Sequence, residues 1–190
     1  MKHIPRMKKE DAEPEALDVW NEVSFDLAIF HIFAHSPAVF DKWRKLNREL
    51  QQGDEGEIPK LCKEIAIVHA SVLSDSSYEW ANHGSQMLRA GGTQAQIDAL
   101  IARTTEADVF DETQKLIIKF TTEIAEQARP TEATLTAMSE KYPNKDIVKL
   151  TCLICYYMFN SRIGNLGGLV EGDDEDYGMF HLGRKTKDEK

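Results

Sequence analysis

The sequence predicts an all-α fold, a single domain of about seven or eight helices. Apolar residues recur at intervals of three and four along most of the chain, which is the spacing of helices with one buried face. Serine, threonine or proline precedes several of these segments and glycine or proline follows several of them, as is typical of helix ends. No segment alternates apolar and polar residues over the length of a strand, so no β-sheet is predicted.

Composition and charge narrow the class of protein. A chain of 190 residues suits one domain that buries about 70% of the surface exposed by its unfolded form. The formal charge of −9, from 32 acidic and 23 basic residues, and the lack of a basic stripe argue against a nucleic-acid partner. The chain shows neither the apolar core of a secretory signal nor the run of roughly 20 apolar residues that a membrane span needs.

The first part of the chain is predicted to hold an arm, two helices and an apolar segment between them. Residues 1–13 show no packing pattern and are predicted to be an N-terminal arm, and Pro14 suits the first position of a helix. Residues 25–33 are densely apolar, which predicts either a short buried helix or an oligomer contact. Ser36 and Pro37 suit the cap and first position of a helix to about residue 52.

The central part of the chain predicts two adjacent helices. The segment after Pro59 is apolar over so much of its circumference, up to about residue 73, that it is predicted to lie at the centre of the fold. A second helix is predicted over 78–90, and Gly91 and Gly92 suit its C-terminal stop.

The remaining segments predict a series of helices and a tail. The predicted ranges are 93–102, opened by a capping box of Thr93 and Gln96, then 112–127, 131–140 and 147–163. Residues 14–170 are therefore predicted to form the helical domain. Residues 171–190 are glycine-rich, acidic and then basic, and they are predicted to be a loosely held tail.

One group of side chains suits proton transfer. Glu79 and His83 lie one helical turn apart and share a stripe with Ser76. A carboxylate beside an imidazole can make that imidazole an acid or base at neutral pH. The competing interpretation is structural, because Ser-x-x-Glu before a helix is also a capping box, and the spacing alone leaves both open.

Glu64 is the third candidate, on the preceding helix. It lies at the shoulder of the apolar stripe, so it is either buried with a partner or a rim glutamate paired with Lys60 or Lys63. Burial without a partner would raise its pKa, which suits a proton carrier. Three or four ligands at metal spacing are missing around Glu79 and His83, so no metal is predicted. His35 and His69 have no carboxylate at matching spacing and are predicted to be core or interface residues.

The three cysteines, Cys62, Cys152 and Cys155, are an odd number without a disulfide framework. This usage is typical of a reducing compartment and predicts a cytoplasmic protein. Cys152 and Cys155 have the C-x-x-C spacing of a redox dithiol. They lie in the middle of a predicted helix, however, and burial as small apolar residues is the favoured interpretation. Arg162, further along this helix, is predicted to pair with a buried carboxylate, an anionic substrate or the tail.

The run SSYEWANHGSQMLRAGGTQAQIDAL resembles the core motif of the carboxymuconolactone decarboxylase and alkylhydroperoxidase D-like family. HIPRMKKEDAEPEALDVWNEV resembles the N-terminal arm of its longer members, and HIFAHSPAVFDKW and YYMFNSRIGNLG resemble two further helices. The resemblance covers most of residues 3–170. It implies a helical protomer that assembles into a homo-oligomer, either a dimer, trimer or hexamer.

The resemblance also implies a relay of side chains. In the peroxidase branch a glutamate, a Cys-x-x-Cys and a histidine act together, and these match Glu64, Ser76, Glu79 and His83. Serine and glutamate cannot cycle through sulfenic acid and disulfide, so dithiol peroxidase activity is not expected there. The decarboxylase branch is similar in having glutamate and tryptophan before the histidine, as in Glu79-Trp80.

The resemblance therefore implies a cofactor-free lyase of the carboxymuconolactone decarboxylase type. His83 is expected to protonate a small carboxylated substrate after loss of carbon dioxide, with Glu79 orienting the imidazole and Glu64 holding the proton. Arg162 or Arg89 would position the anionic substrate, and Trp80 and Ser76 are also predicted to contact it. The alternatives are an oxidoreductase that uses Cys152 and Cys155, and a non-catalytic oligomeric binding protein.

Overall fold

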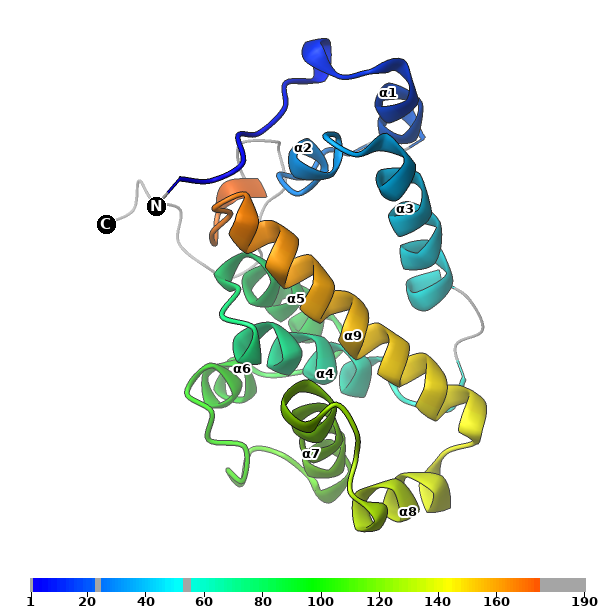
Figure 1. The fold of residues 1–190 in the computed structure, drawn as a ribbon. Coiled ribbons are helices and arrows are strands. Elements are labelled where there is room, and N and C mark those ends of the chain that lie inside the picture. Colours follow the sequence, from blue (N-terminus) through cyan, green and yellow to red (C-terminus); the bar gives the residue numbers. More distant parts are fainter. Residues whose placement is uncertain (1, 23–24, 53–55, 175–190) are drawn as a thin grey trace, which may run out of the picture.

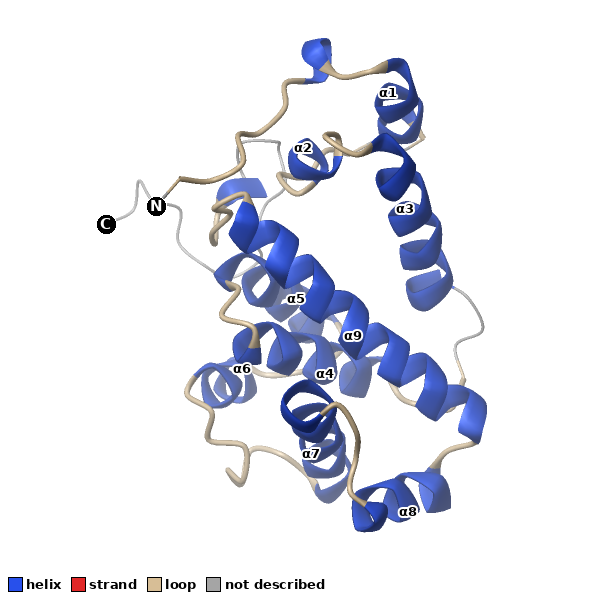
Figure 2. Ribbon diagram, in the orientation of Figure 1, coloured by secondary structure: helices blue, strands red, loops and turns tan. Residues whose placement is uncertain are grey.

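The computed structural model describes residues 2–22, 25–52 and 56–174, and this part of the chain contains nine α-helices and no strand (Figure 2). The all-α prediction is confirmed, and the count exceeds the predicted one because a short apolar segment forms a separate helix of four residues. The helices are α1 (Pro14–Asn21), α2 (Phe30–Phe33), α3 (Pro37–Gln52), α4 (Lys60–Leu73), α5 (Ser77–Arg89), α6 (Gln94–Ile101), α7 (Glu112–Gln127), α8 (Glu132–Lys141) and α9 (Asn144–Leu166), with the 3₁₀ helix η1 (Lys9–Asp11) before them.

Helix α4 lies at the centre of the fold, as its apolar circumference predicts. It packs against α5, α6, α7 and α9 (Figure 1), and consecutive side chains from Ile65 to Val68 are all removed from solvent. A helix that is apolar on every side is stable only when other elements cover it. The long helix α9 runs diagonally across the molecule and links the α1–α3 end to the α7–α8 end (Figure 1).

The N-terminal helices α1, α2 and α3 enclose an aromatic cluster. Its members are buried and meet ring to ring: Trp20, Phe30, Phe33, Phe40 and Trp43. Of the two predictions for residues 25–33, the structure shows the short buried helix. Only Phe25 in that segment is a largely exposed apolar residue, so α2 offers little surface for an oligomer contact.

The two ends of the described chain meet beside α2 and the C-terminal end of α9. The backbone N–H of Ile4 donates to the carbonyl of Leu166 at 3.0 Å, and Arg6 forms an ion pair with Asp173 at 2.6 Å. The predicted arm therefore lies on the helical domain. The first four residues of the predicted tail, 171–174, also pack on it, and Asp174 is 0% exposed; residues 175–190 lie outside the described residues.

Helix α9 has an exposed outer face, and it corrects the prediction for two cysteines. Cys152 and Cys155 are exposed, whereas Cys62 is buried. The prediction of burial was wrong because Leu153 and Ile154 point inward, so the residues on either side of them point outward. The outer face of α9 consists of six exposed residues: Val148, Cys152, Cys155, Phe159, Arg162 and Leu166. No helix in the described ranges has the length and apolar character to cross a membrane.

Candidate active site

The start of α5 decides between capping and chemistry for Ser76 and Glu79. Ser76 is the N-cap, and its Oγ accepts a hydrogen bond from the backbone N–H of Glu79 at 3.5 Å. The backbone N–H of Ser76 donates instead to the carbonyl of Ser71 at 3.0 Å, so the Glu79 carboxylate does not close a capping box. Ser76 therefore has the structural role, and the side chain of Glu79 is left to face a cavity.

His83 and Glu64 form a buried pair between α5 and α4. His83 Nδ1 lies 2.8 Å from Glu64 Oε2, and Glu64 is only 3% exposed. Of the two predictions for Glu64, the structure shows burial with a partner. The imidazole also meets Tyr157 of α9 edge to face, with ring centroids 4.4 Å apart. Because Glu64 engages Nδ1, the nitrogen left for a reacting molecule is Nε2.

The pKa values of both His83 and Glu79 are raised in this site. Burial by itself would lower the pKa of His83, but the negative charge of Glu64 and its hydrogen bond outweigh burial, with a further contribution from Glu79, and the pKa is raised. Burial raises the pKa of Glu79 to about 7, with the charge of His83 opposing and the charge of Asp174 adding to the rise. The Glu79 carboxyl is therefore close to half protonated at neutral pH, and the protonated form of the His83 imidazole is favoured relative to a free histidine.

A cavity of about 360 Å³ opens beside Glu79 and His83. Its size is that of a site for a small molecule. It is lined by residues of α3, α5 and α9, the segment before α2, the first residue of α2, and Asp174: Phe25, Leu27, Ile29, Phe30, Trp43, Arg44, Asn47, Tyr78, Glu79, Asn82, His83, Ser85, Gln86, Arg89, Tyr157, Asn160 and Asp174. Aromatic walls with a few convergent charged groups are typical of such sites.

Hydrogen bonds between helices hold the walls of this cavity in place. The indole N–H of Trp43 on α3 donates to Asn160 Oδ1 on α9 at 2.7 Å. The side-chain amide of Gln51 donates to the hydroxyl of Tyr157 at 2.7 Å. Since Tyr157 packs on His83, the α3–α9 contact also positions the imidazole.

Asp174 closes the cavity from the C-terminal side. Its Oδ1 accepts from the backbone N–H of Ala28 at 2.7 Å and from the hydroxyl of Tyr78 at 3.0 Å, and its Oδ2 accepts from the amide of Asn82 at 2.8 Å. The buried carboxylate thus joins the segment before α2 to the first turns of α5. Asp174 lies in a polar, glycine-rich stretch of the sequence, and nothing in that stretch indicated that its side chain would be buried at the cavity.

Three of the four residues predicted to contact substrate do not line the cavity. Arg162 is exposed on the outer face of α9 and donates to the carbonyl of Met158. Trp80 is partly buried and packs against the hydrophobic core. Ser76 is the N-cap of α5. Arg89, the other predicted cation, does line the cavity, and so does Arg44 of α3. Arg44 follows Phe40 by four residues, so helical spacing could have indicated that it lies near the buried face.

The other candidate groups lie elsewhere. His69 shares a hydrogen bond with the hydroxyl of Thr122 at 2.8 Å, and burial lowers its pKa to about 4, with the positive charge of Arg103 adding to this. His35 contacts the carbonyl of Pro5 at 2.8 Å. Across residues 2–22, 25–52 and 56–174, no group of three or more His, Cys, Asp or Glu residues is arranged to hold a metal ion.

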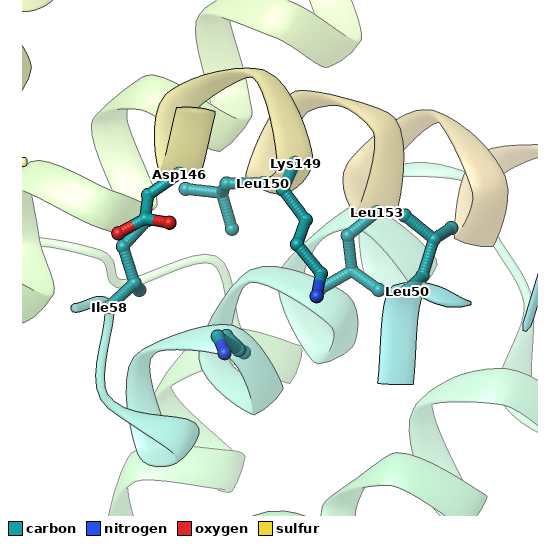
Figure 3. Close-up of a pocket in the computed structure, with 7 residues that line it drawn as sticks. Leu50, Ile58, Asp146, Lys149, Leu150 and Leu153 are labelled. Carbon is teal, nitrogen blue, oxygen red and sulfur yellow. The ribbon is translucent and has the colours of Figure 1, made fainter. Parts of the chain in front are cut away.

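A second cavity, between α9, α3 and α4, is too small for a substrate. Its volume is about 10 Å³, which is close to the space of a single water molecule. Asp146 and Lys149 of α9 border it together with leucine side chains, as Figure 3 shows. Asp146 accepts from the backbone N–H of Glu57 at 2.6 Å, so its role is to hold the chain before α4.

The fold is that of the alkylhydroperoxidase AhpD core. No protein-family model and no curated protein matches the chain, but solved structures do. A peroxidase-related protein from Ralstonia eutropha JMP134, described as an alkylhydroperoxidase AhpD core, superposes with a TM-score of 0.75 at 18% identity, over 90% of this chain and 93% of that one. A peroxidase-related protein from Silicibacter sp. TM1040 superposes with a TM-score of 0.73 at 14% identity, over 88% and 91% of the two chains.

A protein with a different activity shares this fold. A variant of the debrominase Bmp8, solved with 2,3,4-tribromopyrrole, superposes with a TM-score of 0.68 at 14% identity, over 93% of this chain and 95% of that one. The fold that the sequence resemblance implies is therefore confirmed. The reaction has to be argued from the site, because one fold supports several activities.

Proposed function

We propose that the protein is a cofactor-free lyase of the carboxymuconolactone decarboxylase type, acting on a small carboxylated molecule. The observation that carries the proposal is the 2.8 Å contact between His83 and Glu64 at the wall of a cavity that Glu79 also lines. A buried imidazole with a raised pKa is a proton donor, and a carboxylate on its far nitrogen fixes its tautomer and orientation.

The proposed reaction needs one proton and no redox partner. The bond between the substrate's carboxylate carbon and the neighbouring carbon breaks, carbon dioxide leaves, and the electron pair stays on the carbon, delocalised onto a conjugated carbonyl. The Nε2–H of His83 then protonates that carbon, which leaves a neutral imidazole beside Glu64. Glu79, with its pKa of about 7, is placed to return a proton to His83 from solvent.

Two alternatives have less support. An oxidoreductase would use Cys152 and Cys155, but these lie on the outer face of α9, they do not line the cavity, and the pKa of Cys155 is raised by burial and by Cys152, which disfavours the thiolate. A binding protein without catalysis would use the same cavity. Its signature is a ligand that binds and is recovered unchanged.

The experiment that tests the proposal uses unsaturated lactone carboxylic acids in deuterium oxide. The expected result is release of carbon dioxide, together with one deuterium on the product carbon that carried the carboxylate. Binding without release would favour the binding protein. Consumption of a hydroperoxide that is lost when Cys152 and Cys155 are both changed to serine would favour the oxidoreductase.

We also propose that the chain self-associates through the outer face of α9. The six residues of this face are spaced four, three, four, three and four apart, which is the pattern of a seam between two packed helices. None of them is acidic although the chain has a net charge of −9, so two copies can approach here without repulsion between carboxylates. The same face on a second copy, turned by a two-fold axis, is therefore the proposed occupant.

A further inference from the structure

We propose that Arg44 is the residue that recognises the carboxylate of the substrate, and that the site selects flat, conjugated carboxylates. This inference rests on the proposed function for the reaction that follows, but it concerns binding alone. Arg44 is not among the site residues predicted from the sequence, and it reaches the cavity from α3, whereas His83 and Glu79 reach it from α5.

The guanidinium of Arg44 has donor capacity that the protein does not use. Its Nε is buried and has no hydrogen-bond partner, and no ion pair to Arg44 occurs among the residues that the structure describes. One helical turn further on, Arg48 is paired with Glu22 at 3.5 Å. Burial lowers the pKa of Arg44 below its ordinary value, but an arginine remains charged. A charged donor that is partly removed from water and has no partner is stabilised when an anion binds to it.

Aromatic rings hold the Arg44 side chain without using its hydrogen-bond donors. The guanidinium carbon lies 5.5 Å from the ring centroid of Phe30 and 5.8 Å from that of Phe25. Both distances are within the range of a cation–π contact. The guanidinium is therefore kept in position at the cavity, and its N–H groups stay available for two oxygens of a planar anion.

The carboxylates of the cavity leave this charge available. Asp174 already accepts hydrogen bonds from Ala28, Tyr78 and Asn82, and Glu79 is close to half protonated at neutral pH. The net charge of the chain disfavours an anion at long range, so a local cation has to supply the attraction. Arg44 meets that need inside the cavity.

The walls near Arg44 specify the rest of the ligand. Phe30, Trp43 and Tyr157 line the cavity, and an aromatic lining suits an aromatic or unsaturated body. A carboxylate at Arg44 and a conjugated carbon near His83 would span the space between α3 and α5. The shape of the site therefore favours aromatic or unsaturated carboxylates over flexible aliphatic ones.

The test is a calorimetric titration of the full chain with benzoate, with benzamide as the neutral ligand of the same shape. Wild type is expected to bind benzoate and to bind benzamide at least about tenfold more weakly. Arg44→Gln should lower benzoate affinity about tenfold or more and leave benzamide binding unchanged. Arg48→Gln, on the same helix but exposed, is the matched control and should bind like wild type.

Several outcomes would overturn the proposal. The proposal fails if wild type does not bind benzoate or binds benzoate and benzamide equally well. It also fails if Arg44→Gln keeps the wild-type affinity for benzoate, or if Arg89→Gln rather than Arg44→Gln lowers that affinity. Inorganic phosphate that competes as well as benzoate would overturn the preference for a planar carboxylate. If Arg44→Gln does not fold, Arg44→Lys decides the question, since it keeps the charge but not the planar fork, and wild-type affinity in that variant would count against the proposal.

The binding test is independent of turnover. Failure of the lyase assay with intact Arg44-dependent binding would remove the proposed reaction alone. Turnover that does not depend on Arg44 would remove the proposed subsite alone.

Discussion

Glu64 Oε2 lies 2.8 Å from His83 Nδ1, although the two residues are 19 positions apart on different helices. The contact exists because α4 and α5 pack along each other. The charge of Glu64 and its hydrogen bond raise the pKa of His83 against the effect of burial, which favours the protonated imidazole that the proposed reaction uses.

The first prediction concerns this pair directly. Glu64→Gln should lower the pKa of His83, because the charge of Glu64 is the largest contribution that raises it. The measurement is an NMR titration of the His83 ring protons. Glu49→Gln, an exposed position on α3, is the control and should leave the titration unchanged; a His83 titration that ignores the Glu64 substitution would contradict the assigned cause.

The second prediction concerns turnover. His83→Gln should lower kcat for decarboxylation by roughly 10²–10⁴-fold, the usual contribution of a positioned acid or base, without unfolding the protein. The measurement is the rate of carbon dioxide release at neutral pH, with circular dichroism to verify folding. His35→Gln serves as the control, since His35 only contacts the backbone of the arm. An undiminished rate would remove His83 from the mechanism.

The third prediction concerns stability and pH. The folded-state pKa of Glu79 is raised from 4.5 to about 7, so the folded state binds more protons than the unfolded state between these values. The stability that goes with this is fully present below pH 4.5 and is lost as pH rises through about 7. The raised pKa of His83 acts in the same direction, with its contribution present below about 6.5 and lost above the folded pKa.

Glu79→Gln removes the first of these effects. Between pH 4 and pH 8, the unfolding free energy of the variant should improve relative to wild type by on the order of 3 kcal/mol. Urea unfolding at a series of pH values measures this. Two stability curves that stay parallel over that range would show that Glu79 titrates normally.

The fourth prediction concerns Asp174. Asp174→Ala leaves the buried donors of Tyr78, Asn82 and Ala28 without their acceptor. An unsatisfied buried group costs about 1–3 kcal/mol, so the loss of stability should be at least about 2 kcal/mol in urea unfolding. Asp173→Ala removes a partly exposed ion pair with Arg6 and an exposed hydrogen bond from the backbone N–H of Val170, so it should cost less than Asp174→Ala. Equal effects of the two variants would mean that the Asp174 contacts contribute little.

The fifth prediction concerns assembly. Phe159→Glu places a charge at the middle of the outer face of α9, where Phe159 is 40% exposed, and should shift the protein to a smaller species in sedimentation velocity. Leu135→Glu is a matched control, because Leu135 of α8 is 43% exposed but lies outside that face. A wild-type protein that sediments as a monomer would contradict the proposal outright.

Local patterns alone determined much of the fold. Helical spacing gave the range 112–127, and α7 is Glu112–Gln127. The capping box of Thr93 and Gln96 is present with both of its hydrogen bonds. These features depend on residues three or four positions apart, so they can be read from the sequence before any tertiary contact forms.

The same local spacing placed Glu79 and His83 on one face of a helix, but tertiary structure decided the rest of the site. Only packing could show that Glu64 reaches His83, that Arg44 reaches the cavity from α3, and that Asp174 returns from the far end of the chain. Packing also turned Cys152 and Cys155 outward and left Arg162 outside the cavity, since which side of α9 is covered depends on its neighbours. Periodicity fixes what shares a face of a helix; the neighbouring helices decide what that face meets.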